Sequence, residues 1–291
     1  KLDIHRIFPI FVENTCAMLI KENGSILIPI DFSKQSLIAI EQSYNLAKYT
    51  KSKIILMHAS ANGGTEHKKD MEELVAKTAK ESGQPTEYIL LKGDIFDLID
   101  PKAEELECSL IVIGLDTQVR FRSFIGVTNV GKFLMNAPCP VITMRSVDNR
   151  NNCRNILMPI DLSAESREKV GTVVQIAKYY KATIKIVSVF SPNDEKFENE
   201  LLPYLNQVKK FIKDRGVECT NKSIASNNVV EAIISYANNN ECDLIVQMNK
   251  SGLSLGDLFV GAAAQKIAES SNVPVLSIKP MKRESISSGI H

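Results

Sequence analysis

The sequence carries one pattern twice. Ser25–Ser33 reads SILIPIDFS, and 130 positions later Asn155–Ser163 reads NILMPIDLS. Further along, ECSLIVIG at Glu107–Gly114 returns as ECDLIVQM at Glu241–Met248, now at an offset of 134. This period exceeds the roughly 20–50 residues of solenoid repeats and matches a whole domain of about 100–150 residues. The repeat therefore predicts two copies of one fold, so that any site has to be sought twice.

The repeat also sets the expected domain boundaries. We predict an N-terminal extension at 1–23, a first domain at 24–147, a second domain at 153–280 and a disordered tail at 281–291. The polar residues 148–152 form the linker between the two copies. The extension contains apolar residues that are too few for a core of their own, so we expect it to pack on the tandem body.

Composition excludes several classes of function. The chain of 291 residues has a formal net charge of +1, so no overall basic field favours nucleic acid or an anionic membrane. No apolar run approaches the ~18–20 residues that span a bilayer, and the N-terminal residues do not resemble a signal peptide, so we expect a cytoplasmic protein. The six cysteines form no CxxC pair and the four histidines form no cluster, which predicts buried thiols and no metal site.

Strands and helices alternate strictly through both copies. The predicted strands of the first copy are 26–30, 53–58, 86–91, 110–113 and 140–144, and its helices are 33–49, 66–82, 95–106 and 127–136. Those of the second copy are 156–160, 183–189, 218–224, 244–248 and 275–278, with helices 164–180, 195–215, 229–239 and 260–270. Such alternation is typical of an α/β fold in which helices cover both faces of a doubly wound parallel sheet.

A ligand site in such a sheet is expected beyond the carboxyl ends of the strands that flank the topological switch point. In each copy these are the first and the fourth strand. Asp31 and Asp161 follow the first strands, and the long connections 114–126 and 248–261 follow the fourth strands. Either carboxylate could contact a ligand or bond the neighbouring backbone at the turn from strand to helix.

The chain resembles the universal stress protein family. The resemblance rests on I-P-I-D-x-S at the end of the first strand, on E-C-x-L-I-V before the fourth strand, and on P-C-P-V or N-V-P-V at the fifth. It covers nearly everything from Ser25 to Lys279. The resemblance implies two tandem five-stranded sheets of order 3-2-1-4-5, as in adenine-nucleotide α-hydrolases, and pairing through the fifth strands. In a tandem chain, Val141–Met144 and Val275–Ile278 would then pair within one molecule as a pseudo-dimer, while a homodimer stays open.

Many members of this family bind ATP through a loop of pattern G-x2-G-x9-G-[ST], which the first copy retains in part. Gly114 and Gly126 stand at its two ends, but Thr117 takes the place of the middle glycine and the loop is one residue short. Thr128 would supply the hydroxyl if the helix begins one residue later, and Arg120 would supply positive charge. If ATP or AMP binds at all, the resemblance places it in the first domain, together with Asp31.

The second copy departs further from that pattern. Met248 and Ser251 replace both leading glycines, and Ala262 follows Gly261 where the hydroxyl residue is expected. A Cβ at a position that needs positive φ costs roughly 1–2 kcal/mol, and the bulk of Met248 opposes close approach of a phosphate. We therefore expect the second site, with Asp161 and Gly261, to be empty of nucleotide.

The sequence leaves three candidate functions. The first is a non-enzymatic stress-response protein that acts through protein partners, requires no cofactor and binds nucleotide weakly or not at all. The second is an ATP- or AMP-binding sensor, with or without slow hydrolysis, that uses the first-domain loop. The third is an enzyme related to adenine-nucleotide α-hydrolases, which the absence of HxGH, SGGxDS, GxGxxG and GxxxxGK[ST] disfavours. The degraded loops favour the first over the second.

Overall fold

The computed structural model describes residues 20–115, 133–145, 152–192, 197–249 and 257–279 of the chain. The first domain contains strands β1 (Ser25–Pro29), β2 (Lys53–Ser60), β3 (Thr86–Lys92), β4 (Leu110–Gly114) and β5 (Val141–Met144), with helices α2 (Lys34–Thr50), α3 (Lys68–Ser82) and α4 (Ile95–Glu105). The second contains β6 (Asn155–Pro159), β7 (Thr183–Phe190), β8 (Cys219–Ala225), β9 (Leu244–Met248) and β10 (Val275–Ile278), with α7 (Ala164–Tyr180), α8 (Leu202–Lys213), α9 (Val229–Asn239) and α10 (Asp257–Ser270).

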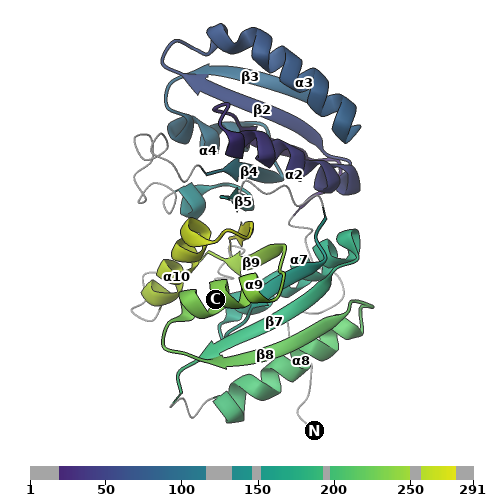
Figure 1. Ribbon diagram of the computed structural model, residues 1–291, viewed down its shortest axis with the longest axis vertical. Coiled ribbons are helices and arrows are strands. Elements are labelled where there is room, and N and C mark those ends of the chain that lie inside the picture. The colour runs from purple at the N-terminus through teal and green to yellow at the C-terminus, as the bar shows by residue number, and fades with distance from the viewer. Residues whose placement is uncertain (1–19, 116–132, 146–151, 193–196, 250–256, 280–291) are drawn as a thin grey trace, which may run out of the picture.

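All ten strands belong to one sheet, of order β3-β2-β1-β4-β5-β10-β9-β6-β7-β8 (Figure 1). Each half of this order reads 3-2-1-4-5, and every strand pair inside a domain is parallel. The predicted α/β fold with two tandem doubly wound sheets is confirmed. The two sheets are moreover continuous with each other, as the repeat and the family resemblance together predicted.

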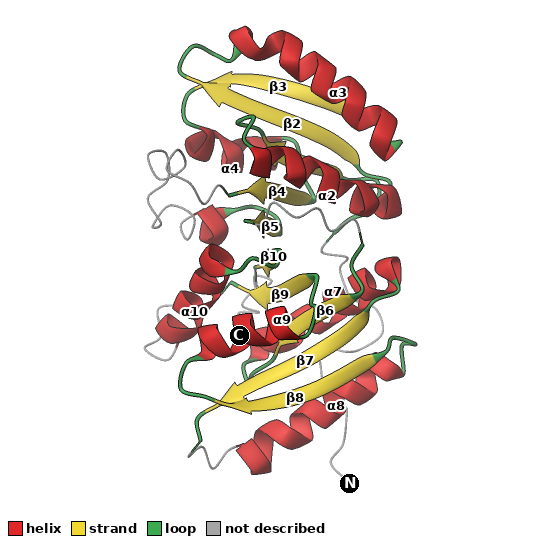
Figure 2. Cartoon of the chain, in the orientation of Figure 1, coloured by secondary structure: helices red, strands yellow, loops and turns green. Residues whose placement is uncertain are grey.

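The domains join where β5 meets β10, and this is the antiparallel pair of the sheet (Figure 2). Val275 lies opposite Thr143, and Leu276 lies opposite Ile142. Pairing the two fifth strands removes an exposed sheet edge from each domain, which would otherwise be free to pair with other chains. The predicted intramolecular pairing of Val141–Met144 with Val275–Ile278 is confirmed.

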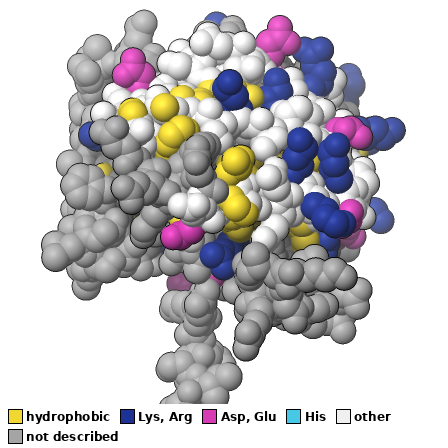
Figure 3. All heavy atoms as spheres, turned by 90° about the horizontal axis from the view of Figure 1, so that it is seen from below, with side chains coloured by type: hydrophobic (Ala, Val, Ile, Leu, Met, Phe, Trp, Pro, Cys, Tyr) yellow, Lys and Arg dark blue, Asp and Glu magenta, His cyan; other side chains and the backbone are white. Residues whose placement is uncertain are grey.

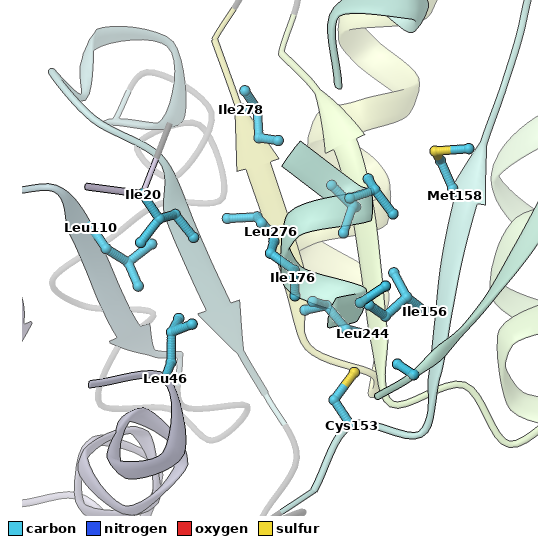
Figure 4. Close-up of a cluster of buried hydrophobic side chains, with 14 of the residues drawn as sticks. Ile20, Leu46, Leu110, Cys153, Ile156, Met158, Ile176, Leu244, Leu276 and Ile278 are labelled. Atoms are coloured by element: carbon cyan, nitrogen blue, oxygen red, sulfur yellow. The ribbon is translucent and has the colours of Figure 1, made fainter. Parts of the chain in front are cut away.

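Helices cover both faces of the sheet, and the core on each face crosses the domain boundary. One cluster of buried side chains takes Met71 from α3 and Val208 from α8 together with α2 and α7, while the other takes Ile99, Ile233 and Ile267 from α4, α9 and α10. Figure 4 shows part of the first cluster, in which Leu46 and Leu110 of one domain and Leu276 and Ile176 of the other share one apolar region. The sheet and both cores therefore make the two domains one packed unit.

Side chains at the junction follow an approximate twofold relation. Tyr49 at the end of α2 stacks on Tyr179, its counterpart 130 positions on, with ring centroids 6.0 Å apart and planes 4° apart. The relation is not exact, since Asn249, itself buried, donates a hydrogen bond of 3.0 Å to the Leu134 carbonyl of the other domain. Its counterpart at the same offset as the fourth strands is Leu115, which cannot donate in this way.

Two helix boundaries differ from the prediction. The helix predicted at 195–215 is an α-helix only over α8, Leu202–Lys213, and is preceded by a π-helical turn at Phe197–Leu201. Pro203 in the first turn of α8 explains its start, because proline is tolerated where backbone N–H groups have no helical partner. The helix predicted from residue 66 begins at Lys68, after a 3₁₀ turn at Thr65–His67.

The outer end of the second domain has a surface of mixed charge. Figure 3 views the molecule from the side of β8 and α8, where Lys and Arg side chains lie among Asp and Glu side chains. Lys210 is paired with Asp214 at 2.6 Å, so positive charges on this face are partly neutralised by neighbours. None of the helices in the described part of the chain is long and apolar enough to cross a membrane.

The predicted extension and tail fall mostly outside the described residues. Of the extension, only Ile20 and the residues that follow it are described, and Ile20 is fully buried in the cluster shared by both domains. That contact agrees with packing of the extension on the body, while the arrangement of residues 1–19 stays a prediction.

Candidate functional site

In each domain the crevice opens where the first and the fourth strand separate. β1 pairs with β2 along its whole length, from Ser25 to Pro29, but pairs with β4 only at Ile26 and Leu27. Pro29 and Pro159 are the last residues of β1 and β6. A missing N–H is tolerated at a strand end that has already left one neighbour.

Asp31 and Asp161 lie directly after these strands, and both bind their own turn. Oδ1 of Asp31 accepts hydrogen bonds from the Ser33 backbone N–H at 3.0 Å and from the Ser33 hydroxyl at 2.6 Å. Asp161 accepts the same two bonds from Ser163. Each serine in turn caps the following helix. The structure thus gives both carboxylates the structural role that the sequence left open beside a ligand role.

The end of the fourth strand distinguishes the two domains. A Cβ added at Gly114 would lie 2.3 Å from the carbonyl oxygen of Gln35 and 2.6 Å from the backbone nitrogen of Ser36. Gly114 therefore lets the first turn of α2 lie directly against β4. Met248 occupies this position in the second domain, where an equally close approach of a helix backbone would clash with its Cβ.

A cavity of about 310 Å³ opens in the second domain beside Met248. Its polar lining comes from the turn after β6 and the first half of α7, and from β9. Its apolar lining comes from β7, α9 and α10 as well as from the strand ends. The lining residues with polar side chains are Asp161, Ser163, Ser166, Lys169 and Gln247, and the apolar ones include Val189, Ile233, Met248, Ala263 and Ile267.

Lys169 is the unusual member of this lining, because its side chain is buried with 4% of its surface exposed. Burial lowers the pKa of its ammonium from the ordinary 10.5 to about 8, although the charge of Asp161 opposes that shift. Burial alone would raise the pKa of Asp161, but hydrogen bonds from Ser163 and the charge of Lys169 outweigh it and keep the pKa below the ordinary value. The two groups therefore carry opposite charges in a cavity whose described lining is mostly apolar.

Lys169 and Asp161 nevertheless do not form a direct ion pair. Nζ of Lys169 donates one hydrogen bond of 3.3 Å to the Ser166 hydroxyl, and no carboxylate of the described residues lies within ion-pair distance of it. Gln247 is also buried: its Nε2 donates to the Ala264 carbonyl at 2.7 Å and to the Ser277 hydroxyl at 3.2 Å, while its Oε1 accepts no bond in the described part of the chain. The cavity lining thus retains unused hydrogen-bonding capacity of both kinds.

The first domain has a cluster of rings beside the turn that follows β1. Nδ1 of His58 lies 2.7 Å from the Ile30 carbonyl, which fixes the proton on Nδ1, and Nε2 is buried without a partner among the described residues. The rings of Phe32 and His67 lie 5.2 Å and 5.0 Å from that of His58. Phe32 has φ of 60°, a conformation rare outside glycine. The bond from His58 to the carbonyl that follows β1 gives this histidine a structural role.

Most of the loop residues predicted to bind nucleotide lie outside the described residues. This applies to Thr117, Arg120, Gly126 and Thr128, so a nucleotide site in the first domain stays a prediction. Gly261 lies within α10. Of the predicted site residues, the structure places Asp31 in the turn after β1, bonded to Ser33, and Asp161 in the lining of the Lys169 cavity.

Sequence reasoning missed Lys169, although the repeat contained the signal. Its counterpart 130 positions earlier is Ala39, on the buried face of α2. Lys169 follows Ser166 by three residues and precedes Val173 by four, and both are buried. A lysine within an apolar helical stripe, where the other copy has alanine, marks a difference between two otherwise equivalent cores.

The cysteines show no reactive site in the part of the chain that is described. All five described cysteines are free, four of them buried, which confirms the prediction of buried thiols for those four. Burial raises the pKa of Cys108 to about 11 and that of Cys139 to about 12. Thiols with such values hold little thiolate at neutral pH and are poor nucleophiles. The described residues also contain no group of His, Cys, Asp and Glu side chains that could hold a metal ion.

Comparisons with known proteins agree with this geometry. The model of the universal stress protein family matches residues 22–145 and again 152–279. Universal stress protein MJ0531 of Methanocaldococcus jannaschii is 26% identical over 154 residues, which cover 47% of this chain and 88% of that protein. A universal stress protein from Archaeoglobus fulgidus DSM 4304 superposes with a TM-score of 0.74 at 17% identity, covering 91% of this chain and all of the other. A protein of unknown function from Pseudomonas aeruginosa PAO1 reaches 0.68 at 19% identity, covering 91% and 94%.

Proposed function

Since the chain belongs to the universal stress protein family in both of its halves, we propose that it is a non-enzymatic stress-response protein that acts through protein partners. In this proposal the two domains form a permanent pseudo-dimer, and nucleotide binding is weak or absent. No other chain is needed to complete the pairing, because β5 and β10 already pair within the molecule. The surface recognised by a partner would then be the outer surface of one rigid body.

Met248 at the end of β9 is the observation that carries the proposal for the second domain. A phosphate cradle needs backbone N–H groups that a ligand can approach closely. The family loop has glycine at this position, whereas here a buried methionine side chain lies beside a carboxylate, Asp161. A triphosphate would meet an apolar wall and a negative charge, which supports a site without nucleotide.

The first domain carries the alternative, an ATP or AMP sensor. There Asp31 is exposed at the mouth of the crevice, and the loop from Gly114 to Gly126 keeps its two end glycines. We expect any binding there to be weak, micromolar to millimolar, because one loop glycine and the following hydroxyl residue are replaced. Losing one charge-assisted hydrogen bond costs about 1.5–3 kcal/mol.

Calorimetric titration of the metal-stripped protein with ATP, ADP and AMP tests the proposal. We expect either no heat of binding or one weak site per chain, lost in Gly126→Val and retained in Gly261→Val. Sub-micromolar binding would contradict the proposal. Two equal sites, or the reverse order of the two variants, would show that the second-domain loop binds phosphate after all.

A further inference from the structure

We propose that the cavity of the second domain binds a small monocarboxylate with an apolar body, whose carboxylate pairs with the Nζ of Lys169. This ligand differs in class from a nucleotide, and its binding group lies outside the loop that follows the fourth strand. The cavity of about 310 Å³ lies at the lower end of the range of small-molecule sites.

Four of the five polar side chains in the described lining of the cavity belong to one segment, and the fifth is Gln247 of β9. Asp161, Ser163, Ser166 and Lys169 all belong to the segment from the end of β6 to the second turn of α7. The opposite lining is apolar and comes from β7, α9 and α10: Val189, Val229, Ile233, Ala263, Ala264 and Ile267. A ligand that satisfies both parts has one polar head and one apolar body.

The polar end favours one negative charge on that head. Lys169 is buried, and of its three N–H donors one is used within the described part of the chain, in the long bond to Ser166. Oδ1 of Asp161 is occupied by the two donors of Ser163 and does not reach Nζ within ion-pair distance. A buried ammonium is unfavourable unless it is paired and hydrogen-bonded, and a ligand carboxylate supplies both.

The same charges disfavour a polyanion. Lys169 and the partial positive charge at the start of α7 can stabilise about one further negative charge beside Asp161. A di- or triphosphate would bring two to four negative charges next to that carboxylate, without a second cation among the lining residues that the structure describes. The cavity is therefore matched to a monoanion.

The first domain has neither a lysine nor a methionine at the positions equivalent to Lys169 and Met248. At the position of Lys169 it has Ala39, and Gly114 brings the backbone of α2 against β4. The second copy has both differences: Met instead of Gly at the strand end, and Lys instead of Ala on the helix. Met248 and Lys169 both line the cavity, and Lys169 places a positive charge in it.

Titration of the full chain with octanoate, by calorimetry, tests the proposal. We expect one site per chain, with affinity at least tenfold weaker in Lys169→Met, which keeps the length of the side chain and removes the ammonium. Lys178→Met on the exposed face of the same helix is the matched control and should bind as the wild type does. Octanol, which has the same tail without the charge, should bind at least tenfold more weakly than octanoate.

A second pair of variants tests the position of the site. Ala263 lines the cavity whereas its neighbour Ala262 is exposed, so Ala263→Phe should abolish octanoate binding and Ala262→Phe should leave it unchanged. Shortening the tail from octanoate to heptanoate and hexanoate should weaken binding about fourfold per methylene, as burial of each CH₂ predicts.

The proposal is wrong if octanoate fails to bind at millimolar concentration or binds Lys169→Met as tightly as the wild type. It is also wrong if octanol matches octanoate, or if Ala263→Phe leaves binding intact. AMP that bound more tightly than octanoate and depended equally on Lys169 would replace it by a nucleotide site.

Discussion

In the first domain the backbone of α2 lies directly against Gly114, whereas in the second domain Met248 occupies this place and a cavity lies beside it. The strands around these positions have the same order and the same register with their neighbours. Both turns also carry the same aspartate and serine, with the same hydrogen bonds. The two domains therefore differ at a strand end: Gly114 accommodates the backbone of α2, whereas Met248 lines a cavity.

The largest effect is expected when the first domain is given the residue of the second. In Gly114→Met, the new Cβ would meet backbone atoms of Gln35 and Ser36, which cannot move without moving α2. We expect a loss of about 3 kcal/mol or more in the free energy of unfolding, or failure to fold. Thermal and urea denaturation measure it.

Gly83→Ala is the matched control for that variant. Gly83 also needs its glycine, since φ is +67°, but a Cβ there would meet nothing within 4 Å. The expected cost is the conformational one alone, about 1–2 kcal/mol. Equal losses in the two variants would mean that contact with α2 is not what makes Gly114 necessary.

The difference between the crevices was only partly predictable. The repeat located Gly114 and Met248 at equivalent positions, and the resemblance gave the strand order and the pairing of the fifth strands. The loop pattern G-x2-G-x9-G-[ST], however, concerns only whether a site can hold a phosphate. It does not show that Gly114 is needed for the packing of α2. Lys169 escaped notice because a lysine is ordinarily assigned to the solvent face of a helix, and its burial depends on elements far away in the sequence.

A second comparison concerns the strands at the junction, where register partners differ in burial. Leu276 of β10 is fully buried, whereas Ile142 of β5 opposite is partly exposed. Leu276→Ala should cost about 3 kcal/mol, within the range for buried leucines, and Ile142→Ala should cost clearly less. Denaturation of both variants measures this difference, and equal costs would mean that the junction is more symmetric than its burial indicates.

Lys169→Met should stabilise the protein at neutral pH. The folded pKa of Lys169, about 8, lies below the ordinary 10.5, so between these values the unfolded chain binds more protons and stability rises with pH. Below about pH 8 the folded state carries the full penalty of a buried charge, at most about 3 kcal/mol. The variant should remove that penalty and flatten the pH dependence between pH 8 and 10.5.

Denaturation of wild type and variant across that pH range measures the effect, with Lys178→Met as the exposed control. Ala39, the counterpart in the first domain, contributes no such titration, so the pH dependence belongs to the second domain. A variant that is less stable than the wild type at pH 7 would show that the ammonium is well paired in the folded state.

The smallest effect is expected where the two domains are most alike, at the stacked pair Tyr49 and Tyr179. Their rings lie nearly parallel, but Tyr49 also contacts Tyr180 edge-on at 5.4 Å, and the counterpart of Tyr180 in the first domain is Thr50. A double-mutant cycle with Tyr49→Ala and Tyr179→Ala should give a coupling of about 1 kcal/mol, as for other aromatic pairs. A second cycle with Tyr180→Ala should show further coupling to Tyr49, because one ring of the first domain contacts two of the second. If Tyr49 couples to Tyr179 alone, the edge-on contact with Tyr180 adds no stability and the stacked pair obeys the twofold relation.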